Sequence, residues 1–318
     1  MSDIQDRLRG IMVGAVVGDA LGMPLEFQPP RPEYALETEM IKGALPAGSF
    51  TDDTEMALAL SESLLITSPL DVHDLAGRFV AWYQSQPPDI GIHTAAVLKL
   101  IAKGVPVEKA ARQVQDADPD NASNGGLMRT WPIAIARYKQ PGLLTAETTL
   151  QTELTHCHPD CVNASLLLNF IIYQILQESQ SQPAEIVRRA IQQATDQVAF
   201  DEDFLLMMNL APMRMRNDLK NSGWVRHTME TALWAVMTTL SFEEALVRAV
   251  NLGNDADTGG AITGAIAGAL YGLSGIPKRW KDAIHGEYPL HSGKLWFLKD
   301  FIELADKLAA IGDNDKNV

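Results

Sequence analysis

The sequence predicts an all-α protein organised as a single domain. Apolar residues recur at intervals of three and four positions along most of the chain, which is the period of a helix with one buried face. Alternating or β-branched runs of strand length are nearly absent, so little of the chain is expected to form a sheet. The chain has 318 residues and is 46% hydrophobic, which allows a sizeable core.

The helical pattern divides into segments separated by turn signals. Thr67-Ser68-Pro69 is expected to end one helix, and Pro159 suits the first position of another because proline lacks a backbone N–H. Gly14 and Gly18 are expected to allow close packing of the first helix. A short frayed tail is expected over residues 312–318. In chain order, we expect helices over residues 6–19, 55–66, 72–83, 94–102, 107–115, 132–138, 145–155, 160–176, 184–198, 228–239, 242–251, 259–272, 277–283 and 295–310.

Charge and composition exclude several classes of protein. The chain has 26 basic and 40 acidic residues, a net charge of −14, which argues against binding to nucleic acid or to anionic membranes. An anionic ligand can still bind at a metal or at a helix N-terminus, where the local field is positive.

No signal peptide and no uninterrupted apolar run of about 18 residues is visible, so membrane insertion is not expected. Cys157 and Cys161 are the only cysteines, which provides no disulfide framework. We therefore expect a cytoplasmic protein.

Two short acidic clusters stand far apart in the sequence, Thr51-Asp52-Asp53-Thr54 and Asp255-Ala256-Asp257-Thr258. Each opens an apolar, helix-like run. If the fold brings them together, their carboxylates repel, since two unit charges about 4 Å apart cost roughly 4 kcal/mol at an effective dielectric constant of 20. Such a pocket requires cations or protons, and hard oxygen ligands favour Mg, Mn or Ca. The alternative is that both clusters are helix caps, because Asp and Thr are favoured at helix N-termini.

Three further segments carry polar groups that suit a binding site. Asn124-Gly125-Gly126-Leu127-Met128-Arg129 is either a phosphate-binding glycine turn or an ordinary turn. Thr155-His156-Cys157-His158-Pro159 lacks a known zinc spacing, so a histidine that hydrogen-bonds a ligand or a backbone carbonyl is favoured. Glu26 follows Pro24 just beyond the first predicted helix, where its carboxylate can face a pocket.

Taken together in this order, these motifs resemble the ADP-ribosylglycohydrolase family. The motifs are Gly18-Asp19-Ala20-Leu21-Gly22 with Glu26, the two acidic clusters, the Asn124–Arg129 turn and the Thr155–Pro159 segment. The family includes the dinitrogenase reductase-activating glycohydrolase and the ADP-ribosyl-acceptor hydrolases. The resemblance implies a compact, orthogonal bundle of many helices with a centre of two divalent metal ions, Mg or Mn.

The resemblance also implies roles for individual residues. Glu26 and Asp89 are the candidates for the catalytic acid or base, with both assignments open. Trp224 stands where a tyrosine is usual and is expected to stack on adenine. The implied metal ligands are Thr51, Asp52, Asp53, Asp255, Asp257 and Thr258, and the implied substrate-binding residues are Asn124, Gly125, Gly126, Met128, His156 and Trp224.

The resemblance implies a metal-dependent hydrolase that removes ADP-ribose from a modified acceptor, and we expect the protein to be a monomer. Water attacks the anomeric carbon through an oxocarbenium-like state. The partner is an ADP-ribosylated protein or a small ADP-ribosyl conjugate, and the linkage can be to arginine, serine, an O-acetyl group or another acceptor, with ADP-ribosyl-arginine protein favoured. The alternatives are a catalytically silent ADP-ribose-binding relative and a hydrolase of another nucleoside or nucleotide.

Overall fold

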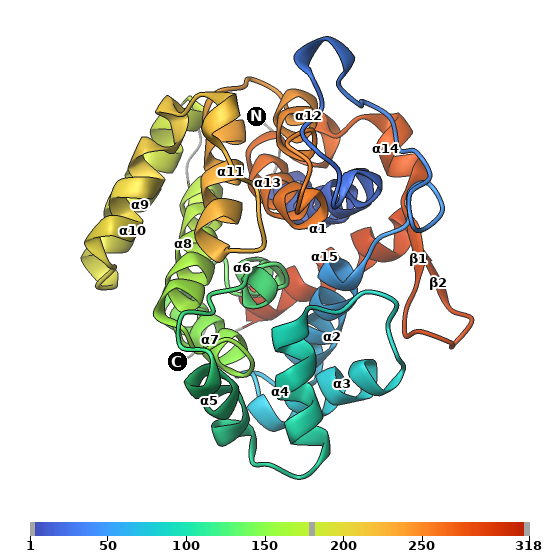
Figure 1. Cartoon of the computed structure of the whole chain (residues 1–318), viewed down its shortest axis with the longest axis vertical. Coiled ribbons are helices and arrows are strands. Elements are labelled where there is room, and N and C mark those ends of the chain that lie inside the picture. The colour runs from blue at the N-terminus through green and yellow to red at the C-terminus, as the bar shows by residue number, and fades with distance from the viewer. Residues whose placement is uncertain (1–3, 178–181, 315–318) are drawn as a thin grey trace.

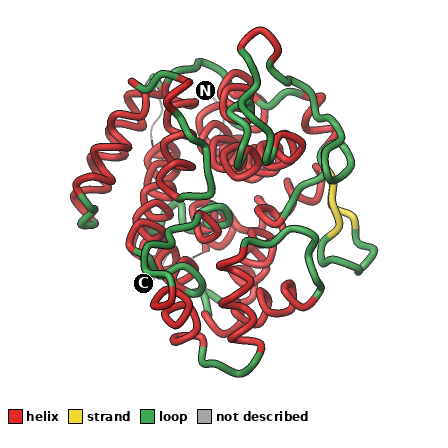
Figure 2. The backbone as a smooth tube through the Cα atoms, viewed as in Figure 1, coloured by secondary structure: helices red, strands yellow, loops and turns green. Residues whose placement is uncertain are grey.

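A computed structural model describes residues 4–177 and 182–314 (Figure 1). Helices make up most of this part of the chain, and the strands described are one short antiparallel pair at an edge of the molecule (Figure 2). The α-helices are α1 Ile4–Gly22, α2 Asp52–Ile66, α3 Val72–Gln84, α4 Ile92–Ala102, α5 Val107–Ala117, α6 Pro132–Ala136, α7 Pro141–Glu153, α8 Pro159–Gln177, α9 Pro183–Gln197, α10 Glu202–Leu210, α11 Val225–Met237, α12 Phe242–Val250, α13 Ala256–Tyr271, α14 Lys278–Ala283 and α15 Leu298–Asn314.

Shorter elements connect these helices. The 3₁₀ turns are η1 Met23–Leu25, η2 Glu33–Ala35, η3 Asn124–Gly126, η4 Ala211–Met213, η5 Arg216–Asp218 and η6 Leu273–Gly275, and the strands are β1 His285–Glu287 and β2 Leu295–Phe297. The prediction of an all-α protein is therefore confirmed.

Three details differ from the sequence-based expectation. The helix expected from residue 295 begins at Leu298, because Leu295–Phe297 pairs with β1 as a strand. The helix α10 was not expected: its run of apolar residues, Phe204 to Met208, shows no clear three-four spacing, and its start depends on Asp201 accepting a hydrogen bond from the Phe204 N–H at 2.9 Å. The last helix runs to Asn314, past the residue 312 from which a frayed tail was expected; residues 315–318 lie outside the described part, and the fray stays a prediction.

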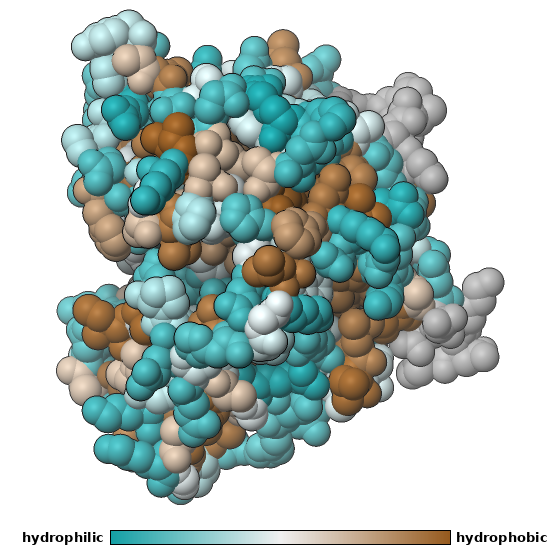
Figure 3. Space-filling model, turned by 90° about the vertical axis from the view of Figure 1, so that its right-hand side faces the viewer, coloured by the Kyte–Doolittle hydropathy of each residue, from teal (hydrophilic) through white to brown (hydrophobic). Residues whose placement is uncertain are grey.

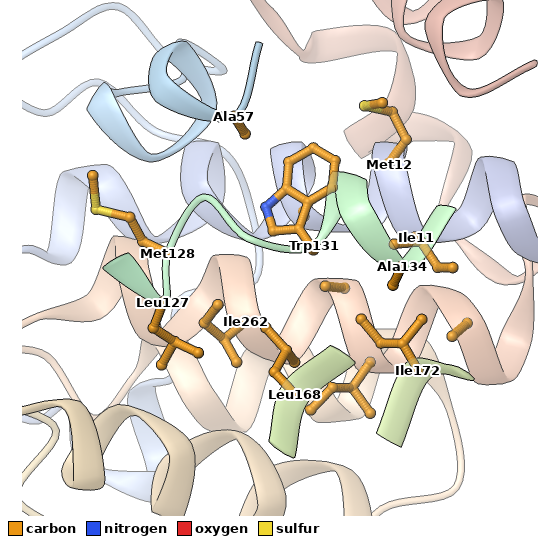
Figure 4. Packing of buried hydrophobic residues seen from close by; sticks show 14 of the residues in the cluster. Ile11, Met12, Ala57, Leu127, Met128, Trp131, Ala134, Leu168, Ile172 and Ile262 are labelled. Carbon is orange, nitrogen blue, oxygen red and sulfur yellow. The ribbon is translucent and has the colours of Figure 1, made fainter. Parts of the chain in front are cut away.

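One large core holds the helices together. Trp131, just before α6, is buried at its centre. Figure 4 shows its indole ring between Ala57 of α2 and Met12 of α1 on one side and Ile262 and Leu168, from α13 and α8, on the other. Helices from the beginning, middle and end of the chain thus share one apolar interior.

The central contact is between α1 and α13, which lie side by side inside the bundle (Figure 1). Their backbones touch through glycines: a Cβ on Gly18 would lie 2.0 Å from the carbonyl oxygen of Gly260, and one on Gly264 would lie 2.0 Å from that of Gly14. The prediction that Gly14 and Gly18 serve close packing is confirmed. This contact places the C-terminal end of α1, with Asp19, beside the N-terminal end of α13.

Two segments are long and apolar enough to cross a membrane by length and composition, Ile4–Leu25 and Pro159–Gln177, and most of each is buried inside the protein. The surface facing the right-hand side of Figure 1 mixes hydrophilic and hydrophobic residues (Figure 3). These two helices therefore serve the core described above, and the absence of membrane insertion stays a prediction.

Candidate functional site

The two acidic clusters meet in one cavity of about 690 Å³. They approach closely enough for the Thr258 hydroxyl to donate a hydrogen bond to Asp53 Oδ2 at 3.3 Å. Six carboxylates and a set of uncharged polar groups line the cavity together. The acidic lining residues are Glu26, Asp52, Asp53, Asp89, Asp255 and Asp257, and the uncharged polar ones include Ser123, Asn124, Gly125, His156 and Thr258.

The acidic clusters lie at the N-termini of α2 and α13, where the helix dipole favours negative charge. Neither Thr51 nor Asp255, the residues at the cap positions, makes a capping hydrogen bond with its side chain. The alternative that these clusters serve only as helix caps therefore lacks its main interaction, and their side chains are available to the cavity.

Asp19 holds the first acidic cluster in place through hydrogen bonds, a role that the sequence did not suggest. Its carboxylate is fully buried and accepts hydrogen bonds from the Thr51 hydroxyl at 2.9 Å and the Thr54 hydroxyl at 2.6 Å, and from both backbone N–H groups. Burial raises the pKa of Asp19 to about 6, although these hydrogen bonds oppose the rise. Thr51 does not line the cavity directly; its hydroxyl hydrogen is committed to Asp19, which leaves the oxygen lone pairs free. The available signal was a single acid inside the otherwise apolar Gly14–Gly22 run.

Crowding of the carboxylates shifts their protonation. Burial and repulsion from neighbouring acids raise the pKa values of Asp52, Asp53 and Asp257 well above the ordinary carboxyl range. Burial, followed by the charges of Asp89 and Asp255, raises the pKa of Glu26 to about 8. Without a counter-charge, several of these carboxyl groups are therefore protonated at neutral pH.

The same carboxylates fit divalent cations. Within the described residues, Asp53 Oδ1 is buried and has no hydrogen-bond partner. Glu26, Asp89 and Asp257 each offer one carboxylate oxygen, and these three atoms lie within 4.8 Å of one another. Oxygen donors alone, in a crowded acidic pocket, are the ligands that Mg, Mn and Ca prefer. Asp89, expected as a catalytic group, thus lies close to the implied metal ligand Asp257.

The cation-free protein is expected to lose stability as the pH rises from about 4 to 8. The native pKa values of Asp19, Glu55 and Glu26, about 6, 7 and 8, exceed those of the unfolded chain, which lie near 4. Through these carboxyls the native state binds more protons than the unfolded state in this window, so their contribution to the free energy of unfolding falls with rising pH. The fewer buried histidines, such as His93 and His156 with their lowered pKa values, contribute with the opposite sign. Urea unfolding in EDTA across the window measures this slope, and saturating Mg²⁺ should flatten it. A cation-free stability that rises with pH would contradict the acidic centre.

The Ser123–Gly125 turn and His156 are held in place by a chain of hydrogen bonds that begins at Arg129. This guanidinium is fully buried and donates to the Thr155 hydroxyl at 2.7 Å and to the Gly125 carbonyl at 2.7 Å. The Thr155 hydroxyl, whose oxygen accepts from Arg129, can direct its hydrogen to His156 Nδ1 at 2.7 Å; in that tautomer Nε2 of His156 carries a hydrogen and donates to the Ser123 hydroxyl at 3.1 Å. Ser123 can in turn donate its own hydrogen into the cavity.

His156 stays neutral in this arrangement. Burial, together with the charges of the adjacent His93 and of Arg129, holds its pKa well below the usual value. His93 packs against it with ring centroids 4.7 Å apart and bonds the Thr155 carbonyl through Nε2 at 2.9 Å. Gly125 is required beside this pair, because a Cβ there would lie 2.8 Å from His156 Cε1. The predicted turn and histidine thus form one wall with defined donors.

Asn124 connects the glycine turn to the carboxylates of the cavity. Its side-chain amide donates to Asp255 Oδ2 at 2.6 Å and to the Thr228 hydroxyl at 2.9 Å. Met128 also lines the cavity, as expected. Gly126 does not: it packs behind the wall, where a Cβ would lie 2.9 Å from Thr152 Cγ2.

Trp224 lies beside the cavity without being part of its lining. Its neighbours Ser222 and Gly223 line the cavity, while its own ring contacts His227 edge-on at 4.6 Å and is 38% exposed. Adenine stacking on Trp224 stays a prediction. The lining residues that the sequence did not suggest are Phe27, Ile90, Gly91, Ile92, His93, Thr94, Ser123, Ser222, Gly223 and Asn254. They come from loops and helix ends, which have no periodic pattern to reveal them.

Comparison with known proteins gives consistent matches over nearly the whole chain. Residues 1–317 match the family described as ADP-ribosylglycohydrolase. The ADP-ribosylarginine hydrolase Tri1 of Serratia proteamaculans is 32% identical over 298 residues, which cover 89% of this chain and 76% of that protein. The ADP-ribosyl-[dinitrogen reductase] glycohydrolase of Rhodospirillum rubrum is 31% identical over 284 residues, covering 87% of this chain and 90% of that protein. A solved structure titled ADP-ribosylglycohydrolase-related protein complex superposes with a TM-score of 0.79 at 30% identity, covering 98% of this chain and 100% of that one.

Proposed function

The chain belongs to the ADP-ribosylglycohydrolase family and is a hydrolase with ADP-ribosyl glycohydrolase activity, and we propose that it acts on ADP-ribosyl-arginine with the aid of two divalent cations, Mg or Mn. The observation that carries the proposal is that one cavity is lined both by a cluster of carboxylates and by a set of hydrogen-bond donors, which we propose form its acidic end and its donor end. An ADP-ribosyl-arginine substrate has the same polarity, because its diphosphate is anionic and its guanidinium is cationic.

The donor end suits the diphosphate. The Ser123 hydroxyl, oriented by neutral His156, can donate to a phosphate oxygen, and Arg129 holds the Gly125 backbone in place through its carbonyl. A neutral donor wall binds the anion without requiring a charged histidine. The diphosphate then lies away from the carboxylates, and the ribose bearing the acceptor reaches them.

At the acidic end, Asp52, Asp53, Asp255 and Asp257, with the hydroxyls of Thr51 and Thr258, would hold the cations. Bound Mg or Mn would supply a polarised water and an anchor for the ribose hydroxyls. Asp19 keeps Thr51 and the start of α2 in position for this task.

Glu26 and Asp89 are placed to move protons at the scissile bond. Both line the cavity and both are only partly buried, as is Asp255, whereas Asp52, Asp53 and Asp257 are buried. In the proposed reaction one of the two carboxyls protonates the leaving guanidine nitrogen and the other accepts a proton from the attacking water. The charge of the unprotonated carboxyl also attracts a cationic acceptor. We further propose a monomeric, cytoplasmic enzyme.

Release of ADP-ribose from an ADP-ribosyl-arginine protein, with Mg²⁺ or Mn²⁺ and then with EDTA, tests the proposal. We expect release with either cation and a loss of at least about 100-fold on chelation, since removing a Lewis acid costs several kcal/mol of transition-state stabilisation. Release that persists in EDTA would contradict the cation requirement. Tight ADP-ribose binding without release from the arginine linkage would contradict the arginine assignment and favour serine or O-acetyl linkages, or a binding role.

A further inference from the structure

Two large apolar side chains stand at the cavity and remain in solvent. Phe27 is 82% exposed and Ile92 is 92% exposed, yet both line the cavity. A single exposed apolar residue is common on protein surfaces. Two of them beside the same functional cavity suggest a contact that forms when a ligand arrives.

The backbone at Phe27 is strained, and the Phe27 side chain is not buried in a way that would offset the cost of this strain. Its φ of 57° lies in the left-handed region, which is an outlier for a bulky side chain. Two reciprocal hydrogen bonds hold it there: the Phe27 N–H donates to the Asn254 carbonyl at 2.6 Å, and the Asn254 N–H donates to the Gln28 carbonyl at 2.8 Å. Strained residues of this kind persist where the surrounding structure fixes them, often at binding sites. Here the fixed feature is an aromatic ring that almost nothing in the free protein covers.

The position of these residues indicates which part of the substrate they meet. Phe27 directly follows Glu26, and Ile92 lies three residues after Asp89, so the loops that carry the two side chains also carry the two partly buried carboxyls. One oxygen from each of these carboxyls lies within 4.8 Å of the other. In the proposed binding mode the diphosphate binds at the donor end of the cavity, so the acceptor lies over Glu26 and Asp89.

We propose that Phe27 and Ile92 form an acceptor clamp that binds the polypeptide around a modified arginine, so that the enzyme prefers protein-linked ADP-ribose to the free amino-acid conjugate. This inference rests on the proposed arginine linkage. The occupant is a peptide segment whose aliphatic and backbone atoms cover the two apolar side chains while its guanidinium faces Glu26 and Asp89. Charge supports this occupant, because the net charge of −14 and the carboxyls next to the two apolar side chains in the chain favour a basic segment.

The test compares two substrates with the same glycosidic bond, an ADP-ribosyl-arginine peptide and free ADP-ribosyl-arginine. Phe27→Ala is expected to raise KM for the peptide about tenfold, which corresponds to about 1.4 kcal/mol of lost binding. Its kcat for the peptide should stay within about twofold, and KM for the free conjugate should rise clearly less than KM for the peptide. Ile92→Ala should show the same pattern and does not touch the strained backbone, so it preserves the test if Phe27→Ala folds poorly.

Tyr34→Ala and Ile66→Ala are the matched controls, because these side chains are 91% and 70% exposed and do not line the cavity. Neither control should change KM for the peptide. Equal losses on both substrates, or no loss on either, would overturn the clamp. Wild-type protein that cleaves neither substrate would instead overturn the proposed arginine linkage, so the two failures are distinguishable.

Discussion

Asp257→Asn is expected to lower kcat/KM for ADP-ribosyl-arginine cleavage by about 10³-fold while leaving the fold intact. Asparagine keeps the oxygen that accepts the Thr258 N–H at 2.9 Å, so the start of α13 retains its hydrogen bond. The change removes a carboxyl whose pKa is raised by burial and by repulsion from neighbouring acids, so asparagine avoids the cost of either charging it or keeping it protonated. Without cations the variant should therefore be at least as stable as the wild type, whereas the gain in melting temperature on adding Mg²⁺ should shrink.

The opposite signs on activity and cation-free stability separate a cation ligand from a structural residue. Asp282→Asn is the control, because this exposed carboxylate pairs with Lys278 on the surface of α14. It should change neither property. Normal turnover in Asp257→Asn, or a large loss of cation-free stability, would remove Asp257 from the proposed cation site.

Gly264→Ala is expected to destabilise the protein by about 3 kcal/mol or more, although alanine is the better helix former. The added methyl group would lie 2.0 Å from the Gly14 carbonyl oxygen, and backbone cannot move aside as a flexible side chain can. The two central helices must separate, which also moves Asp19 relative to the start of α13. Urea unfolding should therefore show a lower midpoint, and activity should fall with it.

Gly77→Ala supplies the same substitution with the opposite expected sign. Gly77 is exposed in the middle of α3, and a Cβ there meets nothing within 4 Å. Its replacement should stabilise the protein by about 0.5–1 kcal/mol through helix propensity alone. A Gly264→Ala variant as stable as Gly77→Ala would contradict the close contact of α1 and α13.

Features with a local cause were predictable from the sequence. The three-four spacing of apolar residues predicts most of the helices. Gly14 and Gly18 indicate a helix that packs closely against a neighbour. The meeting of Asp52–Asp53 with Asp255–Asp257 was also predictable in outline, because two such carboxylate groups in one protein need a shared counter-charge. Family resemblance then supplied roles that spacing alone leaves open.

Features that depend on pairs of residues far apart in the chain were not predictable. In the sequence, Asp19 is one acid within an apolar run, and only the fold shows that its carboxylate accepts hydrogen bonds from Thr51 and Thr54. The left-handed backbone of Phe27 depends on Asn254, and nothing in the residues around Phe27 signals it. The proton positions on His156 likewise follow from Arg129 and Ser123, which precede it in sequence and reach it only in the folded protein.

Because α1 packs against α13, α1 cannot complete its packing until most of the chain has been synthesised. The first helix, buried along nearly its whole length, leaves the ribosome long before the chain reaches Ala256–Tyr271. At a bacterial-type rate of roughly 5–20 residues per second, the delay is on the order of 10–50 s. During this interval α1 must be sheltered by transient contacts or chaperones, and the nascent chain holds only one of the two acidic clusters. Hydrolytic competence therefore arrives late, when the last third of the chain closes onto the first helix.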